Sequence, residues 1–87
     1  MAYLLEDTAA AWRDLQALPR DILIRIEARL HAFTENPHPR GAERVQDTQG
    51  GLRVWVGDDR ILYTVDDTQQ VVTIGRVRHR RDVYRGL

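Results

Sequence analysis

The chain has 87 residues, no cysteine, 43% hydrophobic residues and a formal net charge of zero, because 13 arginines balance 13 acidic residues. These values indicate one small globular domain and exclude a disulfide framework, a thiolate metal site and a cysteine nucleophile. No apolar run approaches the roughly 18 residues of a membrane span, and the acidic pair Glu6-Asp7 stands where a signal peptide needs positive charge, so we expect a soluble cytoplasmic protein without membrane contact.

The first elements predicted are a strand and a helix. A short apolar stretch from Ala2 to Leu5 favours a strand, and Asp7 or Thr8 can cap the helix that follows. Apolar residues recur at steps of three along this helix and are expected to share a buried face: Trp12, Leu15 and Leu18. Pro19 then interrupts the helical pattern, because proline lacks the amide hydrogen that a helix interior needs.

A second amphipathic helix is expected over residues 21–34. Its apolar residues are spaced four, four and three apart, which places them on one helical face: Ile22, Ile26, Leu30 and Phe33. The prolines of the segment 36–41 cannot continue the helix. We therefore expect a helical hairpin around Pro19, followed by a loop.

After this loop the apolar period changes to two, which predicts strands over 52–56, 60–65 and 71–77. Turn signals separate them at Gly57-Asp58-Asp59 and at Asp66-Asp67-Thr68. The predicted fold is α+β, with an N-terminal strand and a helical hairpin packed on a mainly antiparallel sheet of about four strands. We expect residues 1–87 to form a single domain.

Arg53 and Arg60 lie on the predicted strands, and Arg80 follows the last one. Because side chains alternate between the two faces of a strand, Arg53 points away from its apolar neighbours, toward solvent or a ligand. A solvated strand residue is the alternative interpretation for both Arg53 and Arg60, since charged side chains usually lie outside.

Positive charge is concentrated at the end of the chain. From Thr68 onward five arginines face Asp82 alone, which gives +4, whereas residues 1–67 carry −4. The cluster of Arg78, Arg80 and Arg81 repels itself unless an anion or an acidic surface is bound, although a solvated basic tail remains the alternative. The sequence therefore predicts that function resides near the C-terminal arginines.

Tyr84 stands among these arginines. An aromatic residue here either anchors the tail to the core or acts chemically, because nearby cations favour the phenolate and lower the tyrosine pKa, so that it could accept a proton from a sugar hydroxyl. The adjacent His79 could act as an acid or base, or could simply pack. Both alternatives stay open at this point.

Two further aromatic residues and two aspartate pairs complete the set of candidates. Trp55 and Tyr63 could stack on a base, or could serve in core or partner-facing packing. The pairs Asp58-Asp59 and Asp66-Asp67 fit turns better than metal ligands, so we expect no metal site.

An ordered set of these segments resembles the RelE/ParE toxin superfamily. The set consists of Arg53 with Val56-Gly57-Asp58, then Arg60-Ile61-Leu62-Tyr63, then the segment 77–85, Val-Arg-His-Arg-Arg-Asp-Val-Tyr-Arg. The helical hairpin before the sheet agrees with the superfamily's element order. Trp55 is a departure, because many relatives have a basic residue there.

The resemblance implies a toxin of a toxin–antitoxin pair, neutralised by a cognate antitoxin in a possible hetero-oligomer. Members that resemble RelE cut messenger RNA on the ribosome with the RNA's own 2′-hydroxyl as nucleophile, and need neither metal nor cofactor. By this resemblance Arg60, Arg80 and Tyr84 would be catalytic, with the two arginines on the scissile phosphate and Tyr84 as general base or orienting group. The remaining candidates would bind RNA: Arg53, Arg78, His79, Arg81 and Arg85.

Two alternatives stay open. The tail also resembles ParE-type members, which inhibit DNA gyrase and are not nucleases. An inactive homologue that only binds an antitoxin is the other alternative. The neutral net charge counts against the ribosome-dependent nuclease, because ribosome binding favours a basic protein.

Overall fold

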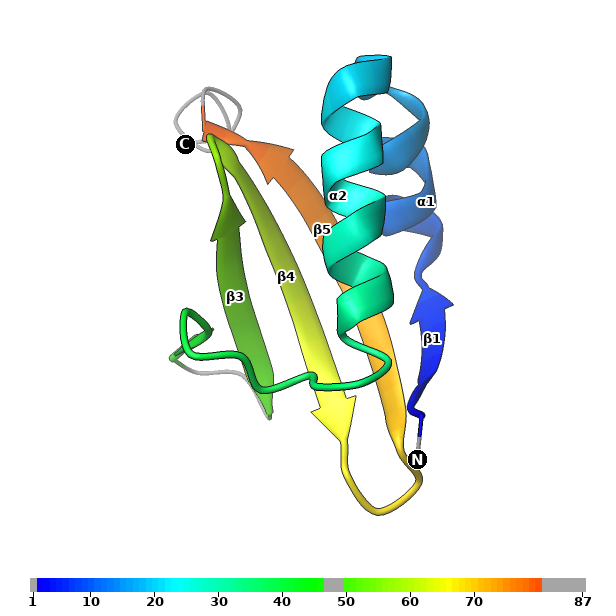
Figure 1. The fold of residues 1–87 in the computed structure, drawn as a ribbon, viewed down its shortest axis with the longest axis vertical. Helices are drawn as coiled ribbons and strands as arrows, with labels where there is room; N and C mark the ends of the chain where they lie inside the picture. Colours follow the sequence, from blue (N-terminus) through cyan, green and yellow to red (C-terminus); the bar gives the residue numbers. More distant parts are fainter. Residues whose placement is uncertain (1, 47–49, 81–87) are drawn as a thin grey trace.

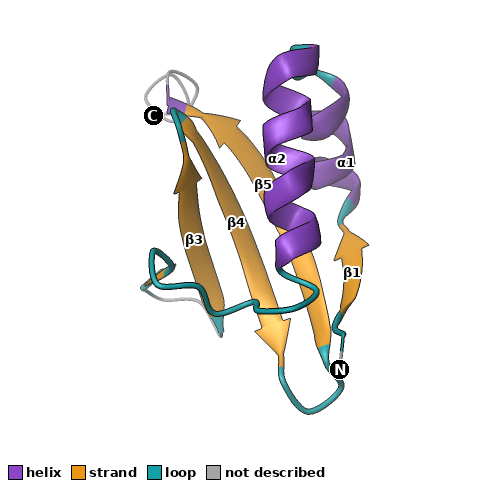
Figure 2. Cartoon of the chain, viewed as in Figure 1, coloured by secondary structure: helices purple, strands orange, loops and turns teal. Residues whose placement is uncertain are grey.

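The computed structural model describes residues 2–46 and 50–80, which form two helices and five strands (Figure 1). The elements are β1 (Leu4–Asp7), α1 (Ala9–Gln16), α2 (Arg20–Ala32), β2 (Glu43–Arg44), β3 (Gly51–Val56), β4 (Asp59–Asp66) and β5 (Val71–His79). The strand order is β1-β5-β4-β3-β2, with β1 parallel to β5 and the other pairs antiparallel (Figure 2). The predicted α+β fold is confirmed. The sheet has one more strand than expected, because β2 has two residues and is too short to show a period of two.

The helical hairpin begins at Thr8, one of the two predicted caps. Its side-chain oxygen accepts a hydrogen bond from the Ala11 amide at 3.1 Å, and its hydroxyl donates to the Gly75 carbonyl on β5 at 2.9 Å. Thr8 therefore starts α1 and fixes it against the sheet. Pro19 stands between the helices, as predicted, and immediately precedes α2.

The buried face of α1 differs from the predicted one. Ala11 and Leu15 are buried, with Leu18 packed against the core, whereas Trp12 is 56% exposed. The reason is helical geometry: steps of three drift around a helix of 3.6 residues per turn, while Ala11, Leu15 and Leu18 follow the i, i+4, i+7 spacing. The prediction for Trp12 was therefore wrong.

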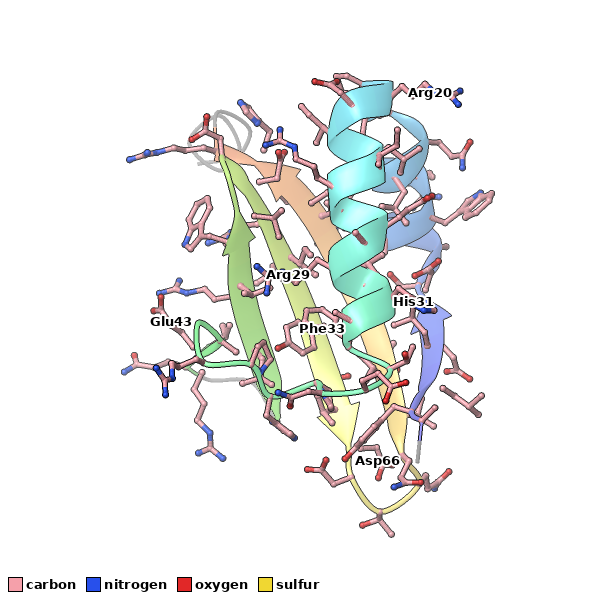
Figure 3. All side chains as sticks on the ribbon, in the orientation of Figure 1. Arg20, Arg29, His31, Phe33, Glu43 and Asp66 are labelled. Carbon is pink, nitrogen blue, oxygen red and sulfur yellow. The ribbon has the colours of Figure 1, made fainter. Side chains whose placement is uncertain are left out.

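The core lies between α2 and the sheet. Ile26, Leu30 and Phe33 of the predicted α2 face are buried, and Figure 3 shows Phe33 between the end of this helix and the strands. The rings of Phe33 and Tyr63 stack with their centroids 4.3 Å apart. The Tyr63 hydroxyl donates to the Pro37 carbonyl at 2.9 Å, and burial raises the pKa of Tyr63 to about 12. Tyr63 is thus a core residue and not a base-stacking one.

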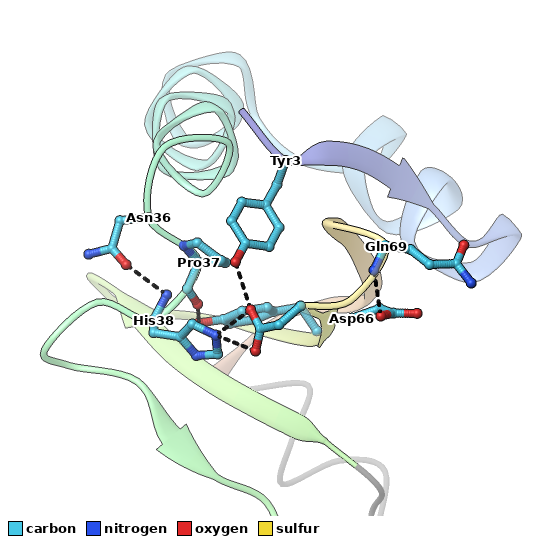
Figure 4. Close-up of polar contacts among 8 residues, drawn as sticks. Tyr3, Asn36, Pro37, His38, Asp66 and Gln69 are labelled. Carbon is cyan, nitrogen blue, oxygen red and sulfur yellow. Dashed lines mark hydrogen bonds and ion pairs between the residues drawn. The ribbon is translucent and has the colours of Figure 1, made fainter. Parts of the chain in front are cut away.

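A cluster of hydrogen bonds joins the start of β1, the loop after α2 and the turn between β4 and β5 (Figure 4). The Tyr3 hydroxyl donates to Asp67 Oδ1 at 2.7 Å, and His38 Nε2 lies 3.1 Å from the same oxygen. These hydrogen bonds, first the one from Tyr3, lower the pKa of Asp67, and the same bond raises the pKa of Tyr3. The cluster holds three segments together at one end of the sheet.

Buried residues of both helices share one core with those of β3, β4 and β5, and α2 crosses in front of β5 in Figure 1, so the helices cover one face of the sheet. Val54, Ile61 and Val77 are buried toward this helical layer, so their strand neighbours point to the opposite side. We call this opposite side the open face. It carries the side chains of Arg53, Trp55, Arg60, Leu62, Arg76 and Arg78. Neither described helix combines the length and apolarity needed to span a membrane.

Candidate nucleic-acid interface

Three neighbouring strands place Trp55, Arg60 and Arg78 in one row across the open face. Trp55 pairs with Arg60 between β3 and β4, and Arg60 pairs with Arg78 between β4 and β5. Two cations directly opposite each other on antiparallel strands repel and destabilise the sheet. The row therefore brings two arginines and an exposed aromatic ring together on the open face, which suits a site for an anion.

Arg60 is the centre of this row. Its guanidinium carbon lies 5.9 Å from the centroid of the Trp55 ring, which is the geometry of a cation–π contact. Its Nε–H is buried and has no hydrogen-bond partner among the described residues. A buried donor without a partner costs free energy, and Arg60 also has no ion pair among the described residues, so its positive charge is not neutralised by a protein carboxylate.

Arg53 occupies the next row and is partly neutralised. Its Nη2 lies 3.2 Å from Oε2 of Glu43, the residue that pairs with it from β2. Both side chains are substantially exposed, and such a pair contributes little stability. The Nε–H of Arg53 is buried and, like that of Arg60, has no partner within the described segments. Arg53 is thus a second cation on the open face, and Glu43 satisfies only some of its hydrogen-bond donors.

Arg80 reaches the same end of the sheet through the hairpin between β3 and β4. Val56 and Asp59 pair across a two-residue loop in which Gly57 has φ of +62°, as a type II′ turn requires. The Arg80 amide donates to the Asp58 carbonyl of this loop at 2.7 Å. Trp55, Gly57, Asp58 and Arg80 together line a cavity of about 380 Å³. Arg80 therefore shares a cavity with Trp55, the residue that contacts Arg60.

Arg76 lies on the open face but has a structural role. Its Nε and Nη2 donate to the two carboxylate oxygens of Asp14 at 2.8 and 3.3 Å, which raises the pKa of Arg76. Asp14 also accepts from the Val77 amide at 2.9 Å. Because β1 ends at Asp7, opposite Ile74, Asp14 supplies β5 with an acceptor beyond the end of its partner strand. No sequence pattern indicated this role, since Asp14 and Arg76 are 62 residues apart.

His79 lies away from the open face. It alternates with Arg78, so it faces the helical layer, and its Nδ1 is 3.2 Å from Oδ1 of Asp59. Asp59 is 2% exposed and belongs to β4, so its assignment to a turn was wrong. The cause is the tight hairpin, which needs two residues and leaves Asp59 to pair with His79 as the strand begins. The structure thus does not place His79 with the candidate arginines.

Of the predicted site residues, the structure brings Arg60 and Arg78 into one row, Arg53 into the next and Arg80 to the adjoining hairpin. Tyr84, Arg81 and Arg85 lie outside the described residues. Trp55 is 40% exposed beside Arg60, which settles its orientation in favour of the open face.

A second cavity of about 320 Å³ lies farther along the sheet. Gly51, Leu62, Thr64 and Gly75 contribute to its lining, and Arg76 is its single charged residue among those described. Because Arg76 is already bonded to Asp14, this cavity offers less to a phosphate than the row around Arg60. The end of the sheet near the β3–β4 hairpin is therefore the better candidate site.

Comparison with known proteins identifies the family. Residues 5–84 match the family model for the ParE toxin of the type II toxin–antitoxin system parDE. The chain belongs to the RelE/ParE toxin superfamily. The toxin is 35% identical over 86 residues to Toxin RelG of Mycobacterium tuberculosis, a match that covers 98% of this chain and 99% of the relative. It is 34% identical over 84 residues to Toxin RelE of the same organism, with 95% and 87% covered.

Solved structures agree with this assignment. The toxin superimposes on a chain of the toxin–antitoxin complex RelBE2 of Mycobacterium tuberculosis with a TM-score of 0.82 and 30% identity, covering 92% of this chain and 93% of that one. The isolated RelE toxin of E. coli shares the fold, with a TM-score of 0.78, 19% identity and coverage of 99% and 100%. This chain is therefore a RelE-like toxin of a type II toxin–antitoxin system.

Proposed function

We propose that this toxin is a ribosome-dependent endoribonuclease that cleaves messenger RNA. The observation that carries the proposal is the row of Trp55, Arg60 and Arg78, with Arg80 bonded to the adjoining hairpin. Such a surface binds phosphates, and an aromatic residue among arginines suits single-stranded RNA, whose bases are free to stack. The curated relatives named RelG and RelE support the same assignment. The ribosome, the proposed target, places this activity in the cytoplasm.

The proposed reaction is attack by the 2′-oxygen of the RNA on the adjacent phosphorus. A new bond from the 2′-oxygen to phosphorus forms while the bond to the 5′-oxygen breaks, which leaves a 2′,3′-cyclic phosphate and a 5′-hydroxyl. The 2′-hydroxyl loses its proton, and the departing 5′-oxygen gains one. Tyr84 is the proposed acceptor of the first proton, by the resemblance and not by any described contact.

Arg60 and Arg80 are the proposed phosphate ligands. Negative charge grows on the non-bridging oxygens as the 2′-oxygen attacks, and fixed cations stabilise that transition state more than the ground state. Arg60 has no ion pair among the described residues, so a phosphate that binds its guanidinium displaces no carboxylate. Arg53 and Arg78 are proposed to hold the flanking backbone phosphates.

Purified toxin added to ribosomes programmed with a short messenger RNA tests this proposal. The expected product is RNA cut at defined positions with 2′,3′-cyclic phosphate and 5′-hydroxyl ends. Arg60→Ala, Arg80→Ala and Tyr84→Phe are each expected to slow the cut. Arg20→Ala is the charge-matched control, because Arg20 lies exposed at the start of α2 (Figure 3) and its loss removes one positive charge away from the open face.

Intact messenger RNA with the unmutated toxin contradicts the nuclease proposal. The resemblance to ParE-type members, which inhibit DNA gyrase, raises gyrase as the alternative target, so a supercoiling assay with DNA gyrase runs in parallel. Inhibition of supercoiling without RNA cleavage selects the alternative. Absence of both effects, with antitoxin binding retained, identifies an inactive homologue.

A further inference from the structure

The cavity beside the β3–β4 hairpin is not explained by phosphate binding alone. Among the described residues that line it, Trp55, Gly57, Asp58 and Arg80, the single cation is Arg80. Trp55 contributes an indole ring, and with 40% of its surface exposed it is among the large hydrophobic residues that the described part of the fold leaves exposed. A phosphate has no use for an aromatic surface, whereas a nucleobase stacks on one.

We propose that this cavity binds a nucleobase of the RNA, stacked on Trp55, next to the phosphate held by Arg60 and Arg80; this inference rests on the proposed RNA substrate. The cavity volume of about 380 Å³ lies within the range of small-molecule sites. Arg60 approaches the Trp55 ring from one side, at 5.9 Å, and so fixes the indole while its exposed part borders the cavity. The ring is thereby prepared to receive a base with little loss of side-chain freedom.

The hairpin also provides rigidity to the cavity wall. Gly57 has φ of +62°, a conformation that residues with a Cβ rarely adopt, so the close turn depends on glycine. The Asp58 carbonyl is occupied by the Arg80 amide at 2.7 Å, which links the end of β5 to the turn. The positions of the aromatic ring and of the cation are therefore set by the same two-residue loop.

Asp58 gives the cavity a chemical preference. Its side chain is exposed at the cavity wall, and an ionised carboxylate accepts hydrogen bonds but donates none. Guanine presents two adjacent donors, N1–H and the N2 amino group, which a carboxylate can accept together. Uracil presents a single N–H between two carbonyl oxygens that repel a carboxylate. The chemistry of the wall therefore favours guanine over uracil.

Fluorescence of Trp55 tests the stacking directly. Trp12 is the second tryptophan of the chain and is exposed on α1, so Trp12→Phe leaves Trp55 as the sole indole. In that background, guanosine monophosphate is expected to quench the emission, and uridine monophosphate to quench at higher concentration. Ribose 5-phosphate, which lacks a base, is expected to leave the emission unchanged. Equal effects of ribose 5-phosphate and the nucleotides overturn the proposal.

Variants of the two recognition residues complete the test. In the ribosome assay Trp55→Ala is expected to reduce cleavage about 5- to 150-fold, the usual effect of losing one stacked base, whereas Trp55→Phe retains most of it. Asp58→Asn is expected to abolish the preference of guanosine over uridine monophosphate. An unchanged ratio of the two affinities overturns the role of Asp58.

The outcomes separate this proposal from the nuclease proposal. Cleavage by the unmutated toxin with an equal rate and equal cut positions for Trp55→Ala overturns the base site and leaves the nuclease intact. Quenching by nucleotides without any cleavage contradicts the nuclease proposal and supports a base-binding cavity. Thermal unfolding of each variant shows whether a loss of activity reflects a loss of fold.

Discussion

Arg60 and Arg76 lie on neighbouring strands and on the same face of the sheet, but they differ in their hydrogen-bond partners. Arg76 is bonded through two nitrogens to Asp14, which also holds the edge of β5. Arg60 stands opposite another arginine, and its Nε–H has no partner among the described residues. The comparison teaches that charge alone does not identify a functional arginine: the residue whose hydrogen bonds the fold leaves unused is the better candidate.

The largest expected effect follows from removing the unused donor. Arg60→Ala is expected to slow ribosome-dependent cleavage on the order of 10²-fold or more, because a fixed charge in the transition state is lost. Its free energy of unfolding should change little, since Arg60 has no described ion pair to lose. Cleavage rates and urea unfolding curves, each compared with Arg20→Ala, check both parts. Cleavage by Arg60→Ala at the rate of the unmutated toxin would contradict the claim that Arg60, unlike Arg76, is a functional arginine.

The opposite pattern is expected for the partnered arginine. Asp14→Ala removes the acceptor of Arg76 and of the Val77 amide, so the free energy of unfolding should fall by roughly 1–3 kcal/mol. The positions at which RNA is cut should stay the same for the molecules that remain folded. Chemical denaturation measures the first effect and mapping of RNA ends measures the second. An altered set of cut sites with unchanged stability contradicts the structural role of Asp14.

Helices and strands with a clear apolar period could be predicted from the sequence. The buried face of α2, the turn at Gly57 and the position of Arg53 on the sheet face opposite Val54 follow from local spacing, and the structure confirms them. β2 could not be predicted, because two residues show no period.

The roles of Asp14 and Asp59 could not be predicted either, since their partners lie 62 and 20 residues away and no local pattern connects them. The candidate site was predictable only in part, because it too depends on contacts between residues that are far apart in the sequence. Alternation places an arginine on a face, but the register between strands decides which arginines meet. Arg60 therefore joins Trp55 and Arg78, whereas His79 is turned to the other face.

A smaller effect on stability is expected from removing the buried hydroxyl of Tyr63, which donates a hydrogen bond to the Pro37 carbonyl. Tyr63→Phe removes the bond to the Pro37 carbonyl and should cost about 1 kcal/mol of unfolding free energy. Because burial raises the pKa of Tyr63 from 10 to about 12, its contribution to stability is complete below pH 10 and is lost as the pH rises toward 12. Unfolding curves across this range check the prediction. The loss of stability attributable to Tyr63 should be missing in Tyr63→Phe.

The smallest effect is expected at the exposed cluster of Tyr3, His38 and Asp67. The hydrogen bond from Tyr3 lowers the pKa of Asp67 below its ordinary value of 3.8. The contribution of Asp67 to stability is therefore present above that value and is lost as the pH falls through the lower pKa of the folded protein. Asp67→Asn should flatten this acid-side slope in unfolding curves. An unchanged slope in the variant would show that the cluster contributes nothing measurable.

The most direct test of the central claim compares Arg60→Ala with Arg76→Ala, two changes that remove the same charge from the same face. Single-turnover cleavage on programmed ribosomes is measured for each variant and divided by its folded fraction. We expect a large loss of rate for Arg60→Ala with the fold retained, and a loss of stability for Arg76→Ala with the rate per folded molecule retained. Equal losses of rate per folded molecule in the two variants would contradict the claim that unused hydrogen bonds mark the functional arginine.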